Sequence, residues 1–397
     1  MKIVKAETLS CDGLWQNWSF LKLTTDEGIT GWTECRDGQG ILPLVERMAN
    51  KMIGEDPRQV GRIDALLYAQ TRIADGGIAS QAAAAVTNAC LDIKAKALGV
   101  PVADLFGGAV RDKLEVYWSH CGMFRARYPD FFEKEMGLQG LRTIDDCVKM
   151  GKEAVARGYR SLKTNVFMFD GPAPRIHGPG FGRTRNHPEL NADDDVLKAM
   201  DDEIAAYRQG AGDAMGIKLD LNFNYKPEGL RRIARRLAHH NLSWLEMDVY
   251  EPNALAGVRS VATMPIASLE AIYGRRHLLP YLQQGAVDVA IIDVIWNGMM
   301  ESHRMASLCD AFEVNVAAHT FASPFQAFMG AQLSACIPNF RVLEFEGDQP
   351  HWQKEIFTHL PEIVDGAMAR PTRPGWGTDI NEEAVRARPA KPSAQNF

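Results

Sequence analysis

The sequence predicts a parallel βα barrel, and the prediction rests on three observations. Six polar residues each close a short apolar run: Asp220, Glu246, Glu270, Asp293, His319 and Glu344. Successive members lie 23 to 26 positions apart, which is about the length of one strand, one helix and two turns. Strands of this kind run parallel, so the six residues are expected together on the rim where barrels place their functional groups.

The first three of these residues form a candidate metal site. Three converging carboxylates repel one another unless a cation joins them, and an all-oxygen ligand set suits a hard ion such as Mg²⁺. A single acid after a strand is more often the N-cap of the next helix than a ligand. Three acids in phase, each after an apolar run, favour the metal site.

Composition places the chain among ordinary globular proteins. Its 397 residues suffice for two domains, and hydrophobic and charged contents of 46% and 24% are typical values. A net charge of −6 indicates neither a nucleic-acid nor a membrane surface, and no apolar run approaches the ~20 residues that span a bilayer. The start runs directly into a strand-like pattern, without a signal peptide. Seven scattered cysteines without a CxxC pair predict buried thiols and a cytoplasmic location.

The first hundred residues predict antiparallel strands followed by helices. Residues 1–35 contain two or three strands with a turn at 26–28, and residues 41–106 are mainly helical, with Gly99 as a C-cap. The loop at 11–18 is rich in aromatic residues and turn formers. It either borders the substrate pocket or is a surface loop with a partly buried tryptophan.

Alternation of strands and helices begins at residue 114. Residues 114–119 and 159–165 predict the first two barrel strands, with a helix over 143–158 between them that starts at the N-cap Thr143. The step from Lys163 to Asp220 is about twice the later period, and the excess lies in residues 167–195, which are dense in Gly, Pro, Arg and His. This insertion is interpreted as a lid over the substrate, with a solvent-exposed or oligomer-contacting loop as the alternative.

Several motifs in the chain, taken in order, are similar to those of a known family. They are the helix motif Asp92-Ile93-Lys94-Ala95-Lys96 closed by residues 98–101, then Lys163, Asp220-Leu221-Asn222, Glu246, Glu270, the Asp293 and His319 pair, Glu344, and the Pro-Gly-Trp-Gly tail at 374–377. Over nearly its whole length the chain resembles the enolase superfamily, within it the mandelate racemase and muconate lactonizing enzyme branch.

The resemblance implies a fold, a cofactor and a first chemical step. The fold is a modified TIM barrel, (β/α)₇β, over residues 113–348, with an α+β capping domain formed by residues 1–112 and a C-terminal segment, 349–397, that packs on it. One Mg²⁺ per subunit is implied at Asp220, Glu246 and Glu270. The implied step is abstraction of the proton α to a carboxylate, which gives an enediolate stabilised by the ion and by a nearby ammonium group.

The chemistry of the residues supports roles for the remaining candidates. His319 is a suitable acid or base near neutral pH, and Asp293 on the neighbouring strand is suited to hold its ring and tautomer. Lys163 is expected as a cation beside the enediolate, and Glu344 as a partner of a substrate oxygen. Substrate contacts are predicted for Asn17, Trp18, Asn165, Asn222 and Trp296. Asn222 is expected to face the same side as Asp220, two residues earlier on the strand.

One departure from the family pattern favours a particular reaction. Racemases of the family carry Lys-x-Lys on the second strand, whereas this chain has Lys163-Thr164-Asn165, and asparagine cannot accept a proton at neutral pH. A site with one base suits syn dehydration of an acid sugar, an aldonate or aldarate, to a 2-keto-3-deoxy acid. Racemization, epimerization or cycloisomerization with Lys163 as second base is the alternative, and a binding protein without activity is a third.

Two further departures concern residues near the candidate site. Glu246-Met247-Asp248 replaces the usual Glu-Glu-Pro, and Trp296-Asn297-Gly298-Met299 stands where the family often has an Arg and a Gly-Gly pair. The expected partner is a small carboxylate substrate rather than nucleic acid or membrane. A homo-oligomer, dimer or octamer, follows from the family analogy alone.

Overall fold

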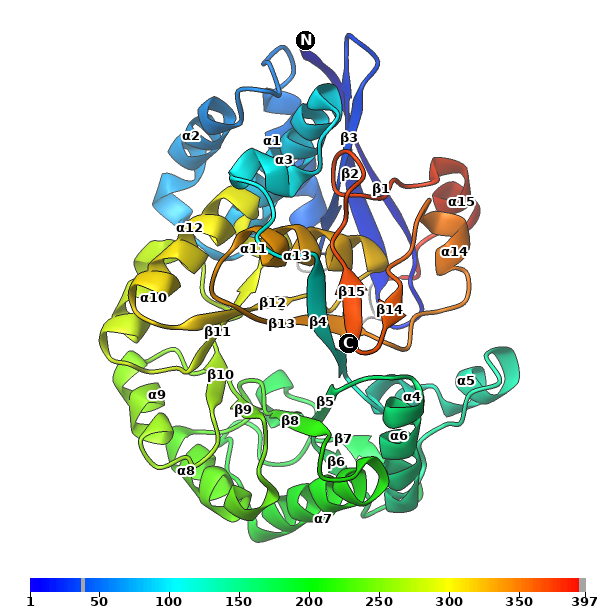
Figure 1. The fold of residues 1–397 in the computed structure, drawn as a ribbon, viewed down its shortest axis with the longest axis vertical. Coiled ribbons are helices and arrows are strands. Elements are labelled where there is room, and N and C mark those ends of the chain that lie inside the picture. The colour runs from blue at the N-terminus through cyan, green and yellow to red at the C-terminus, as the bar shows by residue number, and fades with distance from the viewer. Residues whose placement is uncertain (37–39, 393–397) are drawn as a thin grey trace.

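A closed barrel of parallel strands forms the centre of the computed structural model, which describes residues 1–36 and 40–392 (Figure 1). The strands pair in the order β13-β12-β11-β10-β9-β8-β5-β4, and β13 pairs with β4 to close the ring. Their bounds are β4 Lys113–Ser119, β5 Ser161–Asn165, β8 Gly216–Asp220, β9 Trp244–Glu246, β10 Ile266–Ser268, β11 Val289–Asp293, β12 Asn315–His319 and β13 Phe340–Glu346.

The barrel strands are short and nearly continuous runs of buried residues, because helices cover their outer face and side chains fill the inside. Tyr117, Trp244 and Ile291 belong to a separate apolar cluster of the barrel. The ammonium group of Lys218 lies 4.8 Å from the ring centroids of both Tyr117 and Trp244. Burial lowers the pKa of Lys218 to about 7. Side chains therefore fill the inside of the barrel, and a functional site is expected at one end of it.

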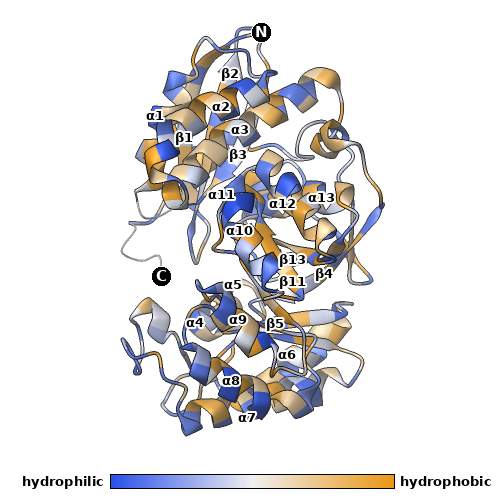
Figure 2. Ribbon diagram, turned by 90° about the vertical axis from the view of Figure 1, so that its left-hand side faces the viewer, coloured by the Kyte–Doolittle hydropathy of each residue, from blue (hydrophilic) through white to orange (hydrophobic). Residues whose placement is uncertain are grey.

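Helices connect successive strands of the barrel: α6 Ile144–Ala156, α7 Asp194–Ala211, α8 Pro227–Arg236, α9 Pro252–Arg259, α10 Gly274–Gln283, α12 Met299–Ala311 and α13 Pro324–Cys336. Figure 2 shows alternating hydrophilic and hydrophobic turns along α7 and α8, as expected of helices that cover a barrel. All residues of α13 are buried, since this helix lies between the barrel and the N-terminal elements. The predicted (β/α)₇β architecture is confirmed.

The N-terminal elements form a capping domain. An antiparallel sheet of β1 Ile3–Asp12, β2 Asn17–Thr25 and β3 Thr30–Cys35 packs on α1 Ile41–Lys51, α2 Val60–Thr71 and α3 Gly77–Leu98. The C-terminal elements are β14 Ile363–Val364, β15 Ala367–Ala369, α14 Gln353–Ile356 and α15 Glu382–Ala387, and Figure 1 shows α15 beside the N-terminal strands. The predicted α+β capping domain is thus confirmed, while its boundaries at 112/113 and 348/349 stay a proposal.

The C-terminal tail is tied to the capping sheet by a buried tryptophan. Trp376 donates from Nε1 to the carbonyl oxygen of Trp32 at 3.0 Å, and its backbone N–H donates to Asp92 at 3.0 Å. Gly375 has φ +75°, and a Cβ there would lie 2.2 Å from the Asp92 carboxylate. The glycine of the Pro-Gly-Trp-Gly motif is therefore required both by its backbone conformation and by the space available.

Local predictions agree with the structure. Gly99 ends α3 in the left-handed conformation, Thr143 is the residue before α6, and the seven cysteines are free and buried. None of the helices in the described ranges combines the length and the hydrophobicity that crossing a lipid bilayer requires.

Candidate active site

The six polar residues predicted to share one rim occur at equivalent places on adjacent strands. Asp220 and Glu246 are paired in register at the ends of β8 and β9, and Asp293 and His319 at the ends of β11 and β12. Glu270 follows β10 by two residues, after Leu269, whose φ of +91° is unusual for a branched side chain. Glu344 lies within β13. The spacing of these residues in the sequence therefore corresponds to positions at or within two residues of the strand ends.

Lys163 on β5 joins three of these acids. Its Nζ lies 2.7 Å from Glu246, 3.0 Å from Glu344 and 3.4 Å from Asp220. Burial alone would lower the pKa of Lys163, but the charges of Glu246 and Glu344 raise it well above its ordinary value. Lys163 is therefore held as an ammonium group, which suits it to stabilise negative charge rather than to accept a proton.

His319 and Asp293 form a hydrogen-bonded pair. Nδ1 of His319 lies 2.5 Å from Oδ2 of Asp293, which leaves Nε2 facing Glu270 at 3.3 Å and Glu344 at 3.8 Å. Burial disfavours the imidazolium, but the charges of Glu270 and Glu344 and the bond to Asp293 raise the pKa of His319 to about 10. The Nε2 atom thus carries a proton that the site can deliver.

Asp293 is both the N-cap of a short helix and the hydrogen-bond partner of His319. Its Oδ1 accepts the backbone N–H groups of Ile295 at 2.7 Å and Trp296 at 3.0 Å, as an N-cap does. Its Oδ2 accepts from His319 and, at 3.0 Å, from Nε2 of Gln326 on α13. Gln326 is held in turn by Glu34 of the capping domain, which accepts its backbone N–H at 3.1 Å.

The candidate metal ligands form a buried acidic group whose chemistry fits a hard divalent cation. Burial, together with the charges of Asp248 and Asp220 and against that of His319, raises the pKa of Glu270 to about 8. Burial and the charges of Asp220 and Glu246 likewise raise the pKa of Asp248 to about 7. The charges of neighbouring acids thus add to the effect of burial, and a divalent cation with an oxygen ligand set would offset that repulsion. Asp248 thus adds a fourth carboxyl group.

The predicted substrate-binding residues differ in their surroundings. Asn165 is paired in register with Asp220, and its Oδ1 is buried without a hydrogen-bond partner among the residues that the structure describes, as is Nε1 of Trp296. The ring of Trp296 lies 5.1 Å from that of His319. These two residues are thus brought to the site with unused polar atoms.

The other three substrate-binding predictions are placed differently. Asn222 was expected to continue the strand of Asp220, and this is wrong, because β8 ends at Asp220 and Asn222 has φ +46°. Its backbone N–H donates to Asp220 at 2.8 Å, in a tight turn. Asn17 donates to the carbonyl oxygen of Lys391, and Trp18 is fully buried with its ring 5.4 Å from that of Phe357. The structure thus places Asn17 and Trp18 in the capping domain, and their role in substrate binding stays a prediction.

His120 belongs to the site but was not singled out from the sequence. It directly follows β4, and its Nδ1 lies 3.0 Å from Oγ of Ser119 and 3.1 Å from Glu346. Burial, together with the charge of Lys163 and against that of Glu344, lowers the pKa of His120 to about 4, so it is a neutral imidazole. A polar residue closing the first strand was visible in the printed sequence, and the same rule that found His319 applies to it.

Aromatic side chains and an arginine border the two histidines. The ring of Phe321 lies 5.3 Å from that of His120 and 6.0 Å from that of His319. The guanidinium of Arg36, at the end of β3, lies 5.2 Å from the Phe321 ring and 5.3 Å from the Trp296 ring. The capping domain therefore contributes a positive charge close to His319, which the sequence reasoning also missed.

The insertion at 167–195 packs against the loop that follows β8. It contains the small hairpin β6 Phe167–Met168 and β7 Arg175–Ile176, and His177 stacks on Tyr225 at 6.0 Å. Two of its arginines have surface carboxylate partners: Arg175 with Asp170 and Arg185 with Asp195. A lid function for this segment stays a prediction.

Comparisons with known proteins identify the family. The family described as "Enolase C-terminal domain-like" matches residues 146–384, and "Mandelate racemase / muconate lactonizing enzyme, N-terminal domain" matches residues 14–107. The chain belongs to the mandelate racemase and muconate lactonizing enzyme family. It is an enzyme of the enolase superfamily, as the ordered motifs predicted.

Relatives within this family carry different names. D-xylonate dehydratase of Haloferax volcanii is 27% identical, with 97% of this chain and 88% of that protein covered. D-gluconate dehydratase of Thermoproteus tenax is 26% identical, with coverage of 96% and 72%. A crystal structure from Burkholderia xenovorans strain LB400, bound to magnesium and fumarate and named as a proposed L-alanine-DL-glutamate epimerase, is 42% identical. It has a TM-score of 0.95 and coverage of 98% and 96%.

Proposed function

We propose that this enzyme is a Mg²⁺-dependent dehydratase of an aldonic or aldaric acid, which yields a 2-keto-3-deoxy acid. The observation that carries the proposal is the asymmetry of the site. On one side, His319 and Asp293 form an acid–base pair; on the other, Lys163 is locked as an ammonium group by three carboxylates and Asn165 cannot take a proton. The dehydratase names of the relatives at 26–27% identity support the same reaction class.

The cofactor would be held by Asp220, Glu246 and Glu270, with Asp248 beside them. When bound, Mg²⁺ supplies positive charge for the substrate carboxylate and offsets the repulsion among these acids. The magnesium in the 42% identical relative supports this assignment. Glu270 now faces His319 at 3.3 Å, whereas Asp220 and Glu246 face Lys163.

The chain's own residues account for the two proton transfers. His319 takes the proton from Cα of the substrate onto Nε2 when its ring is neutral, a state that a bound cation would favour by offsetting the charge of Glu270, which raises the pKa of His319. Asp293 holds the ring and stabilises the imidazolium. Lys163 stabilises the charge that develops on the substrate carboxylate. The same Nε2 proton then passes to the β-hydroxyl group, which leaves as water as the Cα–Cβ double bond forms. The resulting enol rearranges to the 2-keto acid.

The unused polar atoms of the site fit a polyhydroxylated substrate. Within residues 1–36 and 40–392, Oδ1 of Asn165 and Nε1 of Trp296 have no hydrogen-bond partner, and leaving such buried atoms unpaired costs about 1–3 kcal/mol each. Substrate hydroxyl groups satisfy both an acceptor and a donor. A small carboxylate partner and a homo-oligomeric state remain part of this proposal.

A second candidate function, epimerization, is favoured by one observation. His120 is a neutral imidazole whose Nδ1 is engaged by Ser119 and Glu346, so Nε2 is available for proton exchange. It thereby offers a second base that the sequence reasoning did not include. The proposed epimerase name of the 42% identical relative points in the same direction.

Turnover in D₂O distinguishes the two reactions. A panel of aldonic and aldaric acids with Mg²⁺ is assayed for 2-keto-3-deoxy product and, by NMR, for exchange of the α-proton. We expect keto product in the wild type, none in His319→Asn, and normal product in the control His277→Asn, an exposed histidine of α10. Exchange or inversion without loss of water, abolished by His120→Asn, would replace dehydration by epimerization.

A further inference from the structure

A second cluster of metal-binding side chains lies outside the barrel, on the helices of its outer layer. Asp201 belongs to α7, and His239 and His240 belong to the 3₁₀ turn Ala238–His240 that follows α8. The three residues each offer one ligand atom, and these atoms all lie within 4.8 Å of one another. Asn241 then reverses the chain with φ +49° toward β9, so the two histidines are positioned by a defined turn.

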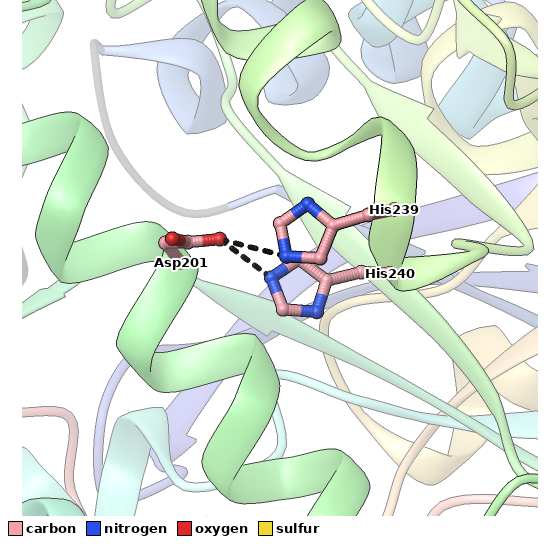
Figure 3. Close-up of side chains that lie close together, drawn as sticks. All are labelled: Asp201, His239 and His240. Carbon is pink, nitrogen blue, oxygen red and sulfur yellow. Dashed lines mark hydrogen bonds and ion pairs between the residues drawn. The ribbon is translucent and has the colours of Figure 1, made fainter.

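The two imidazole rings converge on one carboxylate oxygen. Nε2 of His240 lies 2.7 Å from Oδ1 of Asp201, and Nε2 of His239 lies 3.4 Å from the same oxygen. Figure 3 shows both rings aligned side by side with these nitrogens directed at Asp201. The ring centroids are 4.0 Å apart. Each of these nitrogens would have to release its proton to bind a metal ion, and the ion would then replace the contact with Asp201.

A third group holds the carboxylate in its orientation. Nη2 of Arg236 lies 2.6 Å from Oδ2 of Asp201, which leaves Oδ1 to the histidines. Asp201 thus has one oxygen paired with Arg236 and the other directed at the two imidazoles.

A simple helix-to-turn hydrogen bond explains only part of this geometry. His240 and Asp201 alone suffice for such a bond, and both are mostly buried. His239 is 64% exposed and gains nothing from burial, yet its Nε2 faces the same oxygen. Two imidazoles and one carboxylate, with space on the exposed side for water, are a ligand set for a borderline transition-metal ion and not for Mg²⁺.

We propose that Asp201, His239 and His240 bind one Zn²⁺ ion, with water as the fourth ligand, and that the ion fastens α7 to the end of α8. This site is separate from the catalytic rim, where the predicted ligands are carboxylates. Because the 167–195 insertion leads directly into α7, the ion anchors the helix at which the insertion ends. Zinc binding therefore stabilises the fold without taking part in the reaction.

Zinc titration of the tag-free protein tests the proposal. Isothermal titration calorimetry with Zn²⁺ is performed in saturating Mg²⁺, which occupies the carboxylate site. We expect one zinc ion per chain with micromolar or tighter affinity and a higher melting temperature. His239→Gln, at an exposed position where folding is not at risk, is expected to weaken binding at least tenfold and to abolish the rise. The control His277→Gln is expected to match the wild type.

Cobalt substitution gives a second readout that does not depend on activity. Co²⁺ bound by two imidazoles, a carboxylate and water in a tetrahedral arrangement absorbs visible light strongly, unlike Co²⁺ among carboxylates and waters. We expect this absorption in the wild type and in His277→Gln but not in His239→Gln. Zinc affinity or cobalt absorption that is unchanged in His239→Gln, or a wild type without micromolar zinc binding, would overturn the proposal.

Discussion

Replacing Asp293 by asparagine tests the acid–base pair at the single group that positions it. The wild-type carboxylate accepts four hydrogen bonds: two backbone N–H groups on Oδ1, and His319 and Gln326 on Oδ2. Asparagine has one acceptor oxygen and one donor nitrogen. If the oxygen remains at the helix end, the new NH₂ group faces two donors. If the amide flips, the same conflict arises with the backbone N–H groups.

The magnitude follows from this conflict. Each buried donor that loses its acceptor costs about 1–3 kcal/mol. The fold is therefore destabilised by about 1–3 kcal/mol when Gln326 alone loses its acceptor, because His319 changes tautomer, and by about 2–6 kcal/mol when the two backbone N–H groups lose theirs. With the oxygen at the helix end, His319 is driven to the tautomer in which Nδ1 is the acceptor and Nε2 carries the proton. A neutral imidazole of that tautomer cannot take the α-proton. We therefore expect kcat to fall by about 10³–10⁴-fold, as expected for an orienting carboxylate replaced by its amide.

The assay combines turnover with a direct view of the ring. Loss of the α-proton in D₂O is measured by NMR for any acid that the enzyme accepts, and the ¹⁵N shifts of His319 in histidine-labelled protein report its tautomer. Asp310→Asn, the same change at an exposed site on α12, is the control and is expected to leave both unchanged. An Asp293→Asn enzyme within tenfold of wild type, with an unchanged tautomer, would refute the reasoning.

Three further substitutions have expected outcomes. Lys163→Met leaves the acids of the rim facing one another, so the free energy of unfolding is expected to fall by about 3–5 kcal/mol in urea titrations; an unchanged midpoint would contradict the pairing. Burial raises the pKa of Glu203 from 4.5 to about 8, so the wild type binds this proton mainly when folded and loses up to about 5 kcal/mol of stability as the pH rises between those values. Glu203→Gln is expected to remove that loss. If urea titrations show the same change in the free energy of unfolding between pH 5 and pH 8 for both proteins, the prediction is wrong. Asp92→Asn weakens the acceptor of the Trp32 and Trp376 N–H groups and is expected to cost about 2–3 kcal/mol and expose the tail to limited proteolysis, whereas an equally resistant tail would argue against the tie.

The barrel and its rim were predictable because they obey a strict spacing. Each of the six residues from Asp220 to Glu344 ends an apolar run of the sequence, and parallel strands bring such positions to one edge irrespective of the helices between them. The same logic applies to His120, whose position after the first strand was visible. The residues that can be found from this spacing are therefore those whose position depends on the strand alone.

Features that depend on turns or on distant packing were not predictable in this way. Asn222 leaves the strand because the chain turns with φ +46° immediately after Asp220, and nothing in an apolar run marks that point. Arg36 reaches the site from another domain, and Gln326 from a helix buried on every side. The cluster of Asp201 with His239 and His240 joins two helices whose relative rotation is set by packing. Such contacts cannot be inferred from the pattern of apolar runs, because they depend on how the elements pack in three dimensions.

The hydrogen bond between Trp376 and Trp32 spans 344 positions of sequence. During synthesis the N-terminal sheet leaves the ribosome long before its partner tryptophan has been made, so it cannot complete its packing until almost the whole chain has emerged. Closing so long a loop is entropically costly and has to wait for the barrel to bring the ends together. The first strands made are thus among the last to become fully buried, and a chain cut short near its end is expected to expose their apolar face to quality-control proteases.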